Sequence, residues 1–399
     1  MKTFTNFSFH MYTEIAFGKG TENQVADLVK KYGGTKVMMV YGGGSVKKAG
    51  LYDTVVAKLN EAKIPFVELP GVQPNPRRSL VEKGLKIAQE QGVDFLLGLG
   101  GGSSIDTAKG IALGLANDGE YWAYYQGNTP PKMAPVGTIH TIAAAGSENS
   151  GSSVLLDDLD THRKYGFMHA VCRPVFAIMN PEFTYSVPTY QKGVGAADIF
   201  AHTLMRYMIE PTSYLGDKYA ESTLKTVVKY GPIMIANPTD YESHAEIMLA
   251  GSFSHNDVTS LGRSFPKKGG EHALETQLSG TYDTAHGAGL SVVMPPMLKY
   301  FVDHGEAVHI NKVAQLAINV FGVEPDLEDI KATAYEGIAR LRAWLRSIGT
   351  PLTLKELGVP KGDLEDVIAK CNCGPDGVIK AFLDMDKKAV AEIFTSVVE

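Results

Sequence analysis

Short apolar runs alternate with longer amphipathic stretches over the first half of the chain, and this alternation predicts its secondary structure. Two amphipathic stretches, Leu51–Lys63 and Arg78–Gln91, carry apolar residues at helical spacing. Strands separated by helices are typical of βαβ units, so the pattern predicts a parallel sheet. The apolar runs that we expect to form its buried strands are Val37–Tyr41, Phe66–Leu69, Asp94–Leu99 and Phe176–Met179.

The pattern changes after about Pro181, where strand-like runs almost disappear. The sequence therefore predicts an α/β domain over residues 1–183 and an all-helical domain over residues 184–399. A chain of 399 residues is long for a single core, which agrees with two domains. We expect the active site in the cleft between them. The later segments with helical spacing are Gly193–Ile209, Lys218–Met234, Ala245–Ser254, Ala332–Ser347 and Leu364–Lys370.

Composition and charge narrow the functional classes. A net charge of -6 gives no signal for binding a polyanion, so we do not expect nucleic acid as a partner. The N-terminus has no apolar signal-peptide core and no apolar run approaches the length of a membrane span, so we expect a cytoplasmic protein with no membrane partner. The three cysteines, Cys172, Cys371 and Cys373, are too few for a disulfide framework and lack zinc-knuckle spacing, so we expect reduced thiols.

A glycine-rich segment, GLGGGSSIDTAK (98–109), follows one predicted strand and begins a helical pattern. Glycines let the backbone approach a pyrophosphate closely, and the following helix N-terminus offers unpaired N–H groups and a positive dipole end. Ser103 and Ser104 could hydrogen-bond a phosphate. Because the third glycine of G-x-G-x-x-G is missing, the segment is either a related phosphate loop or an ordinary β–α turn.

A second glycine loop, YGGGSVKK (41–48), follows the predicted strand Val37–Tyr41. Enzymes that prefer NAD commonly place an acidic residue at such a strand end, where it binds the ribose 2′-hydroxyl. Here there are bare backbone, a hydroxyl and the two lysines Lys47 and Lys48, which suit a 2′-phosphate and favour NADP. The alternative is that these lysines only solvate a helix end.

Two pairs of residues suggest a metal site. Asp198 and His202 lie four residues apart in a helical pattern, which places both side chains on one face, one turn apart. His272 and His286 would be about 21 Å apart on a straight helix, so they can share a metal only if the chain turns between them. Gly280 is the residue at which we expect that break. One carboxylate and three neutral imidazoles suit Zn²⁺ or Fe²⁺, and such a site would be Lewis-acidic.

Taken in order, seven segments of the chain resemble the iron-containing (group III) alcohol dehydrogenase family, and within it the NADPH-dependent butanol dehydrogenase-like branch. The segments cover most of the chain, and their combination is more specific than any one of them. They are YGGGSVKKAGLYD (41–53), GVQPNPRRSLVEKG (71–84), GGGSSIDTAK (100–109), TIAAAGSE (141–148), NPEFTYSVP (180–188), AADIFAH (196–202) and EHALETQLSGTYDTAHGAG (271–289).

The resemblance implies an N-terminal dinucleotide-binding domain and a C-terminal helical domain, the architecture that dehydroquinate synthase shares, with one divalent metal in the cleft. The family's metal ligands fall on Asp198, His202, His272 and His286. Its cofactor positions fall on Gly42, Gly43 and Ser45 for the 2′-phosphate end, on Asn75, on Gly101, Gly102, Ser103 and Asp106 in the pyrophosphate loop, and on Thr141, Ser147, Lys164 and Phe183 near the nicotinamide. Dimers are common in the family, so we expect a homodimer.

The chain departs from the family pattern at three places. Ala143 and Ala145 stand where relatives often have a proline and a threonine. Thr276 stands where a histidine commonly serves as a proton relay, and a hydroxyl can pass a proton but cannot hold one near neutral pH. The segment 261–270 is polar and basic where relatives tend to carry a tryptophan, so the pocket mouth is expected to differ.

Together these features predict a metal-dependent oxidoreductase that transfers hydride between NADP(H) and a short-chain alcohol or aldehyde, working as an aldehyde reductase. One alternative is a metal- and NAD-dependent lyase of the dehydroquinate synthase type. Its anionic substrate would need cationic side chains, and Arg206, Arg263, Lys267 and Lys268 could supply them. A second alternative, prompted by Thr276, is a nucleotide-binding protein that has lost its catalysis.

Overall fold

The structure is a computed structural model that describes residues 5–210, 213–263, 270–371 and 373–399. The chain folds as two units, one over His10–Val187 and the other over Pro188–Glu399 together with the N-terminal segment up to Phe9. In the second unit, the backbone amide of Thr5 donates to the carbonyl of Gly262. The boundary expected after residue 183 and the division after Val187 both fall in the connection between the last strand and the first long helix.

The first unit contains a six-stranded sheet in which every neighbouring pair is parallel, so the predicted parallel sheet is confirmed. The four predicted strands are present, with the third shifted by one residue. The strands at Glu14–Phe17 and Val136–His140 were not predicted, because one is only partly buried and the other mixes apolar with polar side chains. In spatial order the strands are β1 (Glu14–Phe17), β8 (Phe176–Met179), β5 (Val136–His140), β4 (Phe95–Gly100), β2 (Val37–Tyr41) and β3 (Phe66–Leu69).

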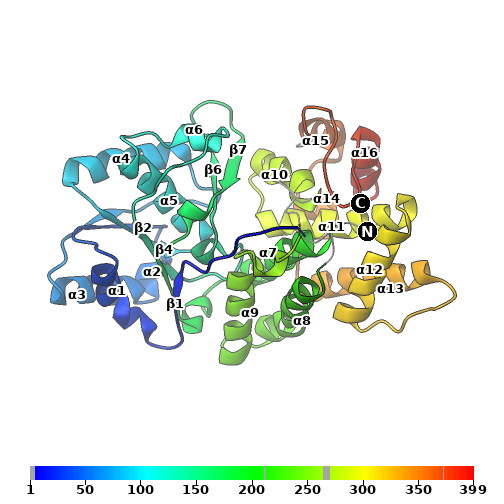
Figure 1. The fold of residues 1–399 in the computed structure, drawn as a ribbon, viewed down its shortest axis with the longest axis horizontal. Helices are drawn as coiled ribbons and strands as arrows, with labels where there is room; N and C mark the ends of the chain where they lie inside the picture. Colours follow the sequence, from blue (N-terminus) through cyan, green and yellow to red (C-terminus); the bar gives the residue numbers. More distant parts are fainter. Residues whose placement is uncertain (1–4, 211–212, 264–269, 372) are drawn as a thin grey trace. The chain divides into compact units, whose positions relative to one another are not determined.

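Helices cover both faces of this sheet, as Figure 1 shows. Side chains along a strand point alternately to opposite faces, so the apolar run of β2 supplies both cores. Met38 and Val40 pack in a core with α4 (Arg78–Gln91) and α5 (Gly102–Ala116). The alternate residues, Val37 and Met39, pack in the other core, and the helices of that core are α1 (Val25–Lys31) and α3 (Leu51–Glu61).

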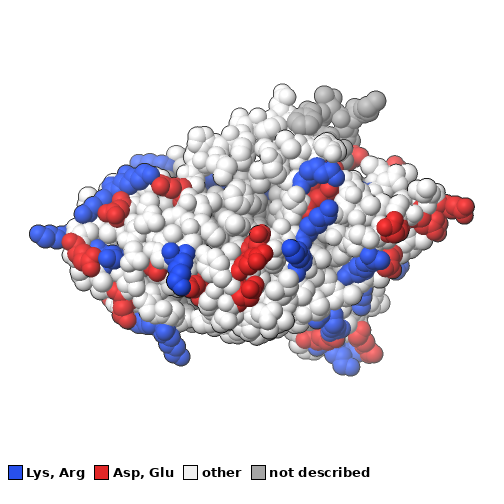
Figure 2. Space-filling model, turned by 90° about the horizontal axis from the view of Figure 1, so that it is seen from below, with Lys and Arg blue, Asp and Glu red and all other residues white. Residues whose placement is uncertain are grey.

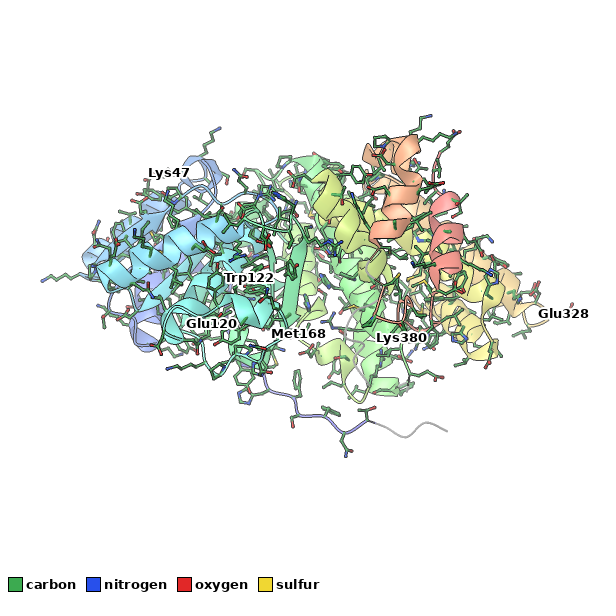
Figure 3. All side chains as sticks on the ribbon, turned by 90° about the horizontal axis from the view of Figure 1, so that it is seen from above. Lys47, Glu120, Trp122, Met168, Glu328 and Lys380 are labelled. Atoms are coloured by element: carbon green, nitrogen blue, oxygen red, sulfur yellow. The ribbon has the colours of Figure 1, made fainter. Side chains whose placement is uncertain are left out.

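A β-hairpin that the sequence did not predict follows the sheet strand β5. Its strands β6 (Ser152–Leu156) and β7 (Lys164–Met168) are antiparallel and form their own two-stranded sheet. The hairpin packs on α6 (Trp122–Tyr125): the Trp122 ring lies 5.3 Å from that of Tyr165, and the Arg78 guanidinium lies 4.4 Å from the Trp122 ring centre. Figure 3 labels Trp122 and Met168 in this region. The remaining short elements are η1 (Thr21–Gln24), α2 (Ser45–Lys48), η2 (Ser147–Asn149), η3 (Ala170–Cys172) and η4 (Pro181–Thr184).

The second unit is helical over its described residues, apart from an isolated bridge between Ile379 and Met385. Its central helix, α7, is buried at every position from Lys192 to Tyr207 and packs against α8, α9 and α11. The predicted helical segments lie on α7, α8, α9, α13 and α15. The bounds are α7 (Thr189–Tyr207), α8 (Tyr214–Ala236), α9 (Tyr241–Ser254), η5 (Val258–Ser260), α10 (Gly270–Tyr282), α11 (His286–His304), α12 (Ala307–Phe321), α13 (Ile330–Ser347), α14 (Leu354–Leu357), η6 (Lys361–Asp363), α15 (Leu364–Lys370) and α16 (Lys387–Thr395).

A buried ionic network joins α8, α12 and the segment after η5. Asp217 of α8 accepts from Lys312 Nζ at 2.8 Å and from the Arg263 guanidinium. One turn later on α8, the Glu221 carboxylate accepts from Tyr207 Oη at 2.9 Å and from Asn319 Nδ2 at 2.8 Å. Removing one partner of such a buried pair leaves an uncompensated charge, so the network holds the end of α7 against its neighbours.

The described helices and the charged surface bear on membrane and polyanion binding. In the described part of the chain, each helix is too short or too polar to cross a lipid bilayer. On the face that Figure 2 shows, basic and acidic side chains of the described residues are interspersed over wide uncharged areas. That face therefore presents no extended field of one sign.

Candidate metal and cofactor sites

The central helix α7 brings Asp198 and His202 together. Their side chains lie one helical turn apart, with Asp198 Oδ1 3.3 Å from His202 Nε2. Both residues are buried, at 5% and 6% exposure. A carboxylate placed this deep is stable only with a cation or hydrogen-bond donors close by. The predicted pair therefore forms one half of a polar cluster inside the helical unit.

The helix α10 carries His272 to the same place. The His272 ring centre lies 4.6 Å from that of His202. One donor atom from each of Asp198, His202 and His272 lies within 4.8 Å of the other two. Metal–ligand bonds of about 2.0–2.2 Å allow such donors to share one ion after small side-chain rotations.

His286 is the first residue of α11, and its ring centre lies 5.3 Å from that of His272. The chain does turn between the two histidines, but not at Gly280, so that expectation was wrong. Gly280 lies inside α10, which continues to Tyr282. The turn comes at Asp283, whose φ of 50° is left-handed, a conformation that Asp tolerates better than most residues.

A glycine determines how closely α11 approaches α7. A Cβ atom on Gly287 would lie 2.1 Å from the carbonyl oxygen of Val194 and 3.1 Å from Cβ of Asp198. Only glycine fits this contact between two helix backbones. The chain thus brings His286 beside the residue pair on α7 by close helix packing, which its spacing in the sequence does not show.

The chemistry of these donors fits a divalent metal ion. Burial and the neighbouring imidazoles hold the pKa of His202 well below its usual value, so this ring is neutral at physiological pH, the form that ligates metals. Among the described residues, the buried atoms His202 Nδ1 and His272 Nε2 have no hydrogen-bond partner. Buried imidazole nitrogens are normally satisfied, and a metal ion would satisfy them here.

Four further residues lie in this region, and the sequence did not assign them to the metal site. The buried ring of His255 stacks on that of His202 with centres 4.1 Å apart. The guanidinium of Arg206 donates to the His202 carbonyl at 2.8 Å. Glu271 and Glu275 of α10 contact His272 and His286, respectively. The sequence could have indicated the two glutamates, because they lie four residues apart on either side of His272. Nothing in the sequence around His255 indicates that it lies beside the site.

Thr276 lies on α10 one turn after His272. Its Oγ1 donates to the His272 backbone carbonyl at 2.5 Å, the usual bond of a threonine back to its own helix. The hydroxyl proton is therefore engaged, while the oxygen lone pairs can still accept. Its role as a proton relay stays a prediction.

Except for Lys164, the cofactor positions predicted in the first unit follow carboxyl ends of neighbouring parallel strands. Glycines 42–44 and Ser45 follow β2, Asn75 follows β3, residues 101–106 follow β4, residues 141–147 follow β5, and Phe183 follows β8. Lys164 begins β7 of the hairpin. Because these strand ends share one edge of the sheet, the structure gathers the loops where α/β proteins bind nucleotides.

The pyrophosphate loop has the geometry of an anion site. Gly101 precedes α5, a helix of 15 residues whose first amides lack helical partners. Gly100 has a φ of 140°, which only glycine adopts readily, and a Cβ on Gly98 would lie 3.3 Å from the backbone of Ile105. The backbone amide of Thr141 donates to the Gly100 carbonyl at 3.1 Å and joins the loops after β4 and β5.

Asp106 and Ser147 are bonded to each other. Ser147 Oγ donates to Asp106 Oδ1 at 2.6 Å, and the amide of Val154 donates to the other carboxylate oxygen at 3.1 Å. Lys109, fully buried on α5, donates to Ser147 Oγ at 3.0 Å and to the carbonyls of Ser147, Ser150 and Ser152 at 2.7–3.0 Å. The loop after β5 is thus bound to the pyrophosphate helix by a buried ionic clamp.

Lys47, labelled in Figure 3, is exposed on α2 beside the loop at 42–45. Its ammonium lies 4.3 Å from the ring centre of Tyr52, which is a cation–π contact. The hydroxyls of Tyr52 and Tyr41 both donate to the Glu68 carboxylate. The carboxylate of Glu68 is therefore close to the end of β2, but it already accepts hydrogen bonds from two tyrosines. The ammonium of Lys47 lies close to the same two tyrosine rings.

The two described arginines that could have bound the anionic substrate of a lyase are engaged in other contacts. Arg206 is fully buried, and Arg263 donates to Asp217 and to the Arg206 carbonyl. These two side chains stabilise the fold around α7. Lys267 and Lys268 lie outside the described residues.

Comparison with known proteins places both units in one family. Residues 13–181 match the family model described as iron-containing alcohol dehydrogenase, and residues 194–398 match that of the C-terminal part of the Fe-containing alcohol dehydrogenase family. The chain is 36% identical over 392 residues to NADH-dependent butanol dehydrogenase A of Clostridium acetobutylicum, covering 98% of each protein. It is 31% identical over 371 residues to the NADPH-dependent aldehyde reductase YqhD of Escherichia coli, covering 92% of each. The crystal structure of NADH-dependent butanol dehydrogenase A from Thermotoga maritima superposes with a TM-score of 0.92 over the full length of both chains, at 32% identity.

Proposed function

The chain belongs to the iron-containing alcohol dehydrogenase family, and we propose that it is an NADP(H)-dependent member that reduces short-chain aldehydes to alcohols. The observation that carries the proposal is the convergence of Asp198, His202 and His272 from α7 and α10 on one buried point. The resemblance to butanol dehydrogenases and to an aldehyde reductase supports the substrate class.

The metal would be held by Asp198, His202 and His272, with His286 as the fourth ligand. A divalent ion bound there acts as a Lewis acid toward the substrate oxygen, and the nicotinamide supplies or accepts the hydride. The chain's own part is to hold these side chains in place and, by burying His202, to keep the pKa of that imidazole low. Nitrogen and carboxylate donors suit Fe²⁺ or Zn²⁺.

Elemental analysis of the purified protein, combined with NADPH oxidation over a set of aldehydes, tests the metal assignment. We expect about one divalent metal ion per chain, turnover that stops after chelation, and recovery when Fe²⁺ or Zn²⁺ is returned. His272→Ala should lose the metal and turnover while the chain stays folded. His10→Ala, which removes an exposed histidine of the first unit, is the matched control and should keep both. Full metal content and activity in His272→Ala would contradict the assignment.

The preference for NADP rests on the loop at 42–45 and on Lys47 beside it. The curated relatives include both NADH- and NADPH-dependent enzymes, so the loop itself has to carry this part of the proposal. Backbone amides, the Ser45 hydroxyl and a nearby ammonium favour a 2′-phosphate, whereas a carboxylate at this place would repel it.

Gly43→Asp tests this reading of the loop. A Cβ on Gly43 meets no atom within 4 Å, so the new side chain fits without displacing its surroundings. We expect the NADPH/NADH ratio of kcat/KM to fall at least about tenfold, a change of about 1.4 kcal/mol. Gly43→Ala adds the same Cβ without charge and should leave the ratio unchanged. An unaltered ratio in Gly43→Asp would refute the loop's role.

The proposal also includes a cytoplasmic location and a homodimer. Among the described residues the three cysteines form no disulfide, which suits a reducing compartment. Light scattering on the purified protein would measure the assembly directly, and a monomer at micromolar concentration would exclude the dimer.

A further inference from the structure

Two buried glutamates of α10 each contact a histidine of the metal site. Glu271 Oε1 lies 3.0 Å from Nδ1 of His272. Glu275, one helical turn later, contacts Nδ1 of His286 across the turn between α10 and α11. Glu271 is 2% exposed and Glu275 is fully buried. The same ring atom thus faces a carboxylate in both histidines.

A carboxylate can only accept a hydrogen bond, so the bond between Glu271 and His272 requires the proton of the neutral imidazole to be on Nδ1. The opposite nitrogen, Nε2, then carries the lone pair. In His272 this Nε2 is the buried atom without a hydrogen-bond partner among the described residues. The tautomer that Glu271 selects is therefore the one that presents a free donor toward the cluster.

The surroundings hold both glutamates in these positions. A Cβ on Gly289 would lie 2.7 Å from Glu275 Oε1, so the backbone of α11 approaches the carboxylate as closely as glycine allows. Glu271 lines a small cavity whose other walls include Met205, Met297 and Phe301. In such apolar surroundings a charge–dipole contact is stronger than in water.

Resting on the metal site proposed above, we propose that Glu271 and Glu275 are positioning residues for the metal, each orienting one histidine, and that Glu271 also fixes the tautomer of His272. They also place negative charge next to the site, in addition to that of Asp198. The negative charge around the site is then larger than the charge that Asp198 alone provides. This additional charge stabilises a bound divalent cation relative to the empty site.

Metal affinity rather than activity tests this proposal, in the full-length protein stripped of metal and titrated with Co²⁺ against a chromophoric chelator. Glu275→Gln and Glu271→Gln should each weaken Co²⁺ binding about 10–100-fold and change the cobalt d–d absorption spectrum. Glu275→Asp keeps the charge but withdraws the carboxylate from His286, so it should also weaken binding. The matched control is Glu221→Gln, which neutralises an equally buried glutamate of the same unit that bonds no histidine.

The possible outcomes distinguish the positioning role of the two glutamates from the metal site itself. Stoichiometric Co²⁺ binding by the wild type, with affinity and spectrum unchanged in Glu275→Gln and Glu271→Gln, would overturn the positioning role and leave the metal site standing. No Co²⁺ binding by the wild type would overturn the proposed function itself. If Glu275→Gln does not fold, Glu271→Gln decides the question. Full affinity in Glu275→Asp with loss in Glu275→Gln would overturn orientation, since charge alone would then explain the effect.

Discussion

Replacing Lys109 by methionine removes the ammonium group that binds the loop after β5 to helix α5. This group has four acceptors within 3.0 Å, one hydroxyl and three carbonyls, although an ammonium donates only three hydrogen bonds at once. Methionine fills nearly the same volume without the charge, so the packing survives while the carbonyls and the nearby Asp106 lose their cation. The structure therefore predicts an electrostatic loss with little change in shape.

The size of the loss follows from the burial of the clamp. Removing one partner from a buried charged network costs about 3–5 kcal/mol, a large part of the 5–15 kcal/mol that stabilises a typical protein. With a denaturant dependence of roughly 2–3 kcal/mol per M for a unit of this size, the urea midpoint should fall by about 1–2 M. The Ser147 side chain loses one of its two hydrogen-bond partners in the same step and keeps only Asp106, so the dissociation constant for NADPH should rise as well.

Each unit contains one tryptophan, which allows the two to be followed separately. Trp122 lies in the first unit, which contains the parallel sheet, and Trp344 lies in the helical unit. In a Trp344→Phe background, the fluorescence of Trp122 reports the unfolding of the unit that contains Lys109. Lys192→Met is the matched control, because it removes a buried lysine of the other unit that donates to the Pro238 carbonyl, and it should leave the Trp122 transition in place. An unchanged midpoint in Lys109→Met would refute the clamp.

Two further predictions concern the helical unit. Burial alone would raise the pKa of Glu221, but hydrogen bonds led by those from Lys218 and Asn319 lower it below its usual 4.5, so its contribution to stability is present above about pH 4.5 and is lost as the pH falls through the folded-state pKa. Glu221→Gln should therefore be less stable than the wild type at pH 7, with a difference that shrinks in urea titrations toward pH 3; a difference independent of pH would contradict this. Gly287→Ala should push α11 away from α7 and lower both thermal stability and metal content, whereas Gly362→Ala, where a Cβ meets open space, should change neither. Normal metal content in Gly287→Ala would show that the close approach is not required.

Periodicity and local spacing predicted much of the fold. The apolar runs at Val37–Tyr41 and Phe176–Met179 form strands of the parallel sheet, because a strand buried on both faces has to be apolar at successive positions. The helical unit was predicted as a class, but α11 was not predicted as an element. It is buried almost all round and contains Pro295 and Pro296, so it shows no amphipathic pattern.

The sequence also predicted part of the candidate metal site, and the tertiary structure determined the rest. The sequence alone placed Asp198 and His202 on one helix face, since four residues make about one turn of helix. It also marked the glycine loops, because strand–glycine–helix order is local. The approach of His286 to within 5.3 Å of His272, measured between ring centres, depended on a turn at Asp283 and on the close packing that Gly287 permits. The contacts of Glu275 and His255 depended on tertiary packing too. Which side chains meet across different helices is set by the fit of whole surfaces, and no spacing along the chain encodes that fit.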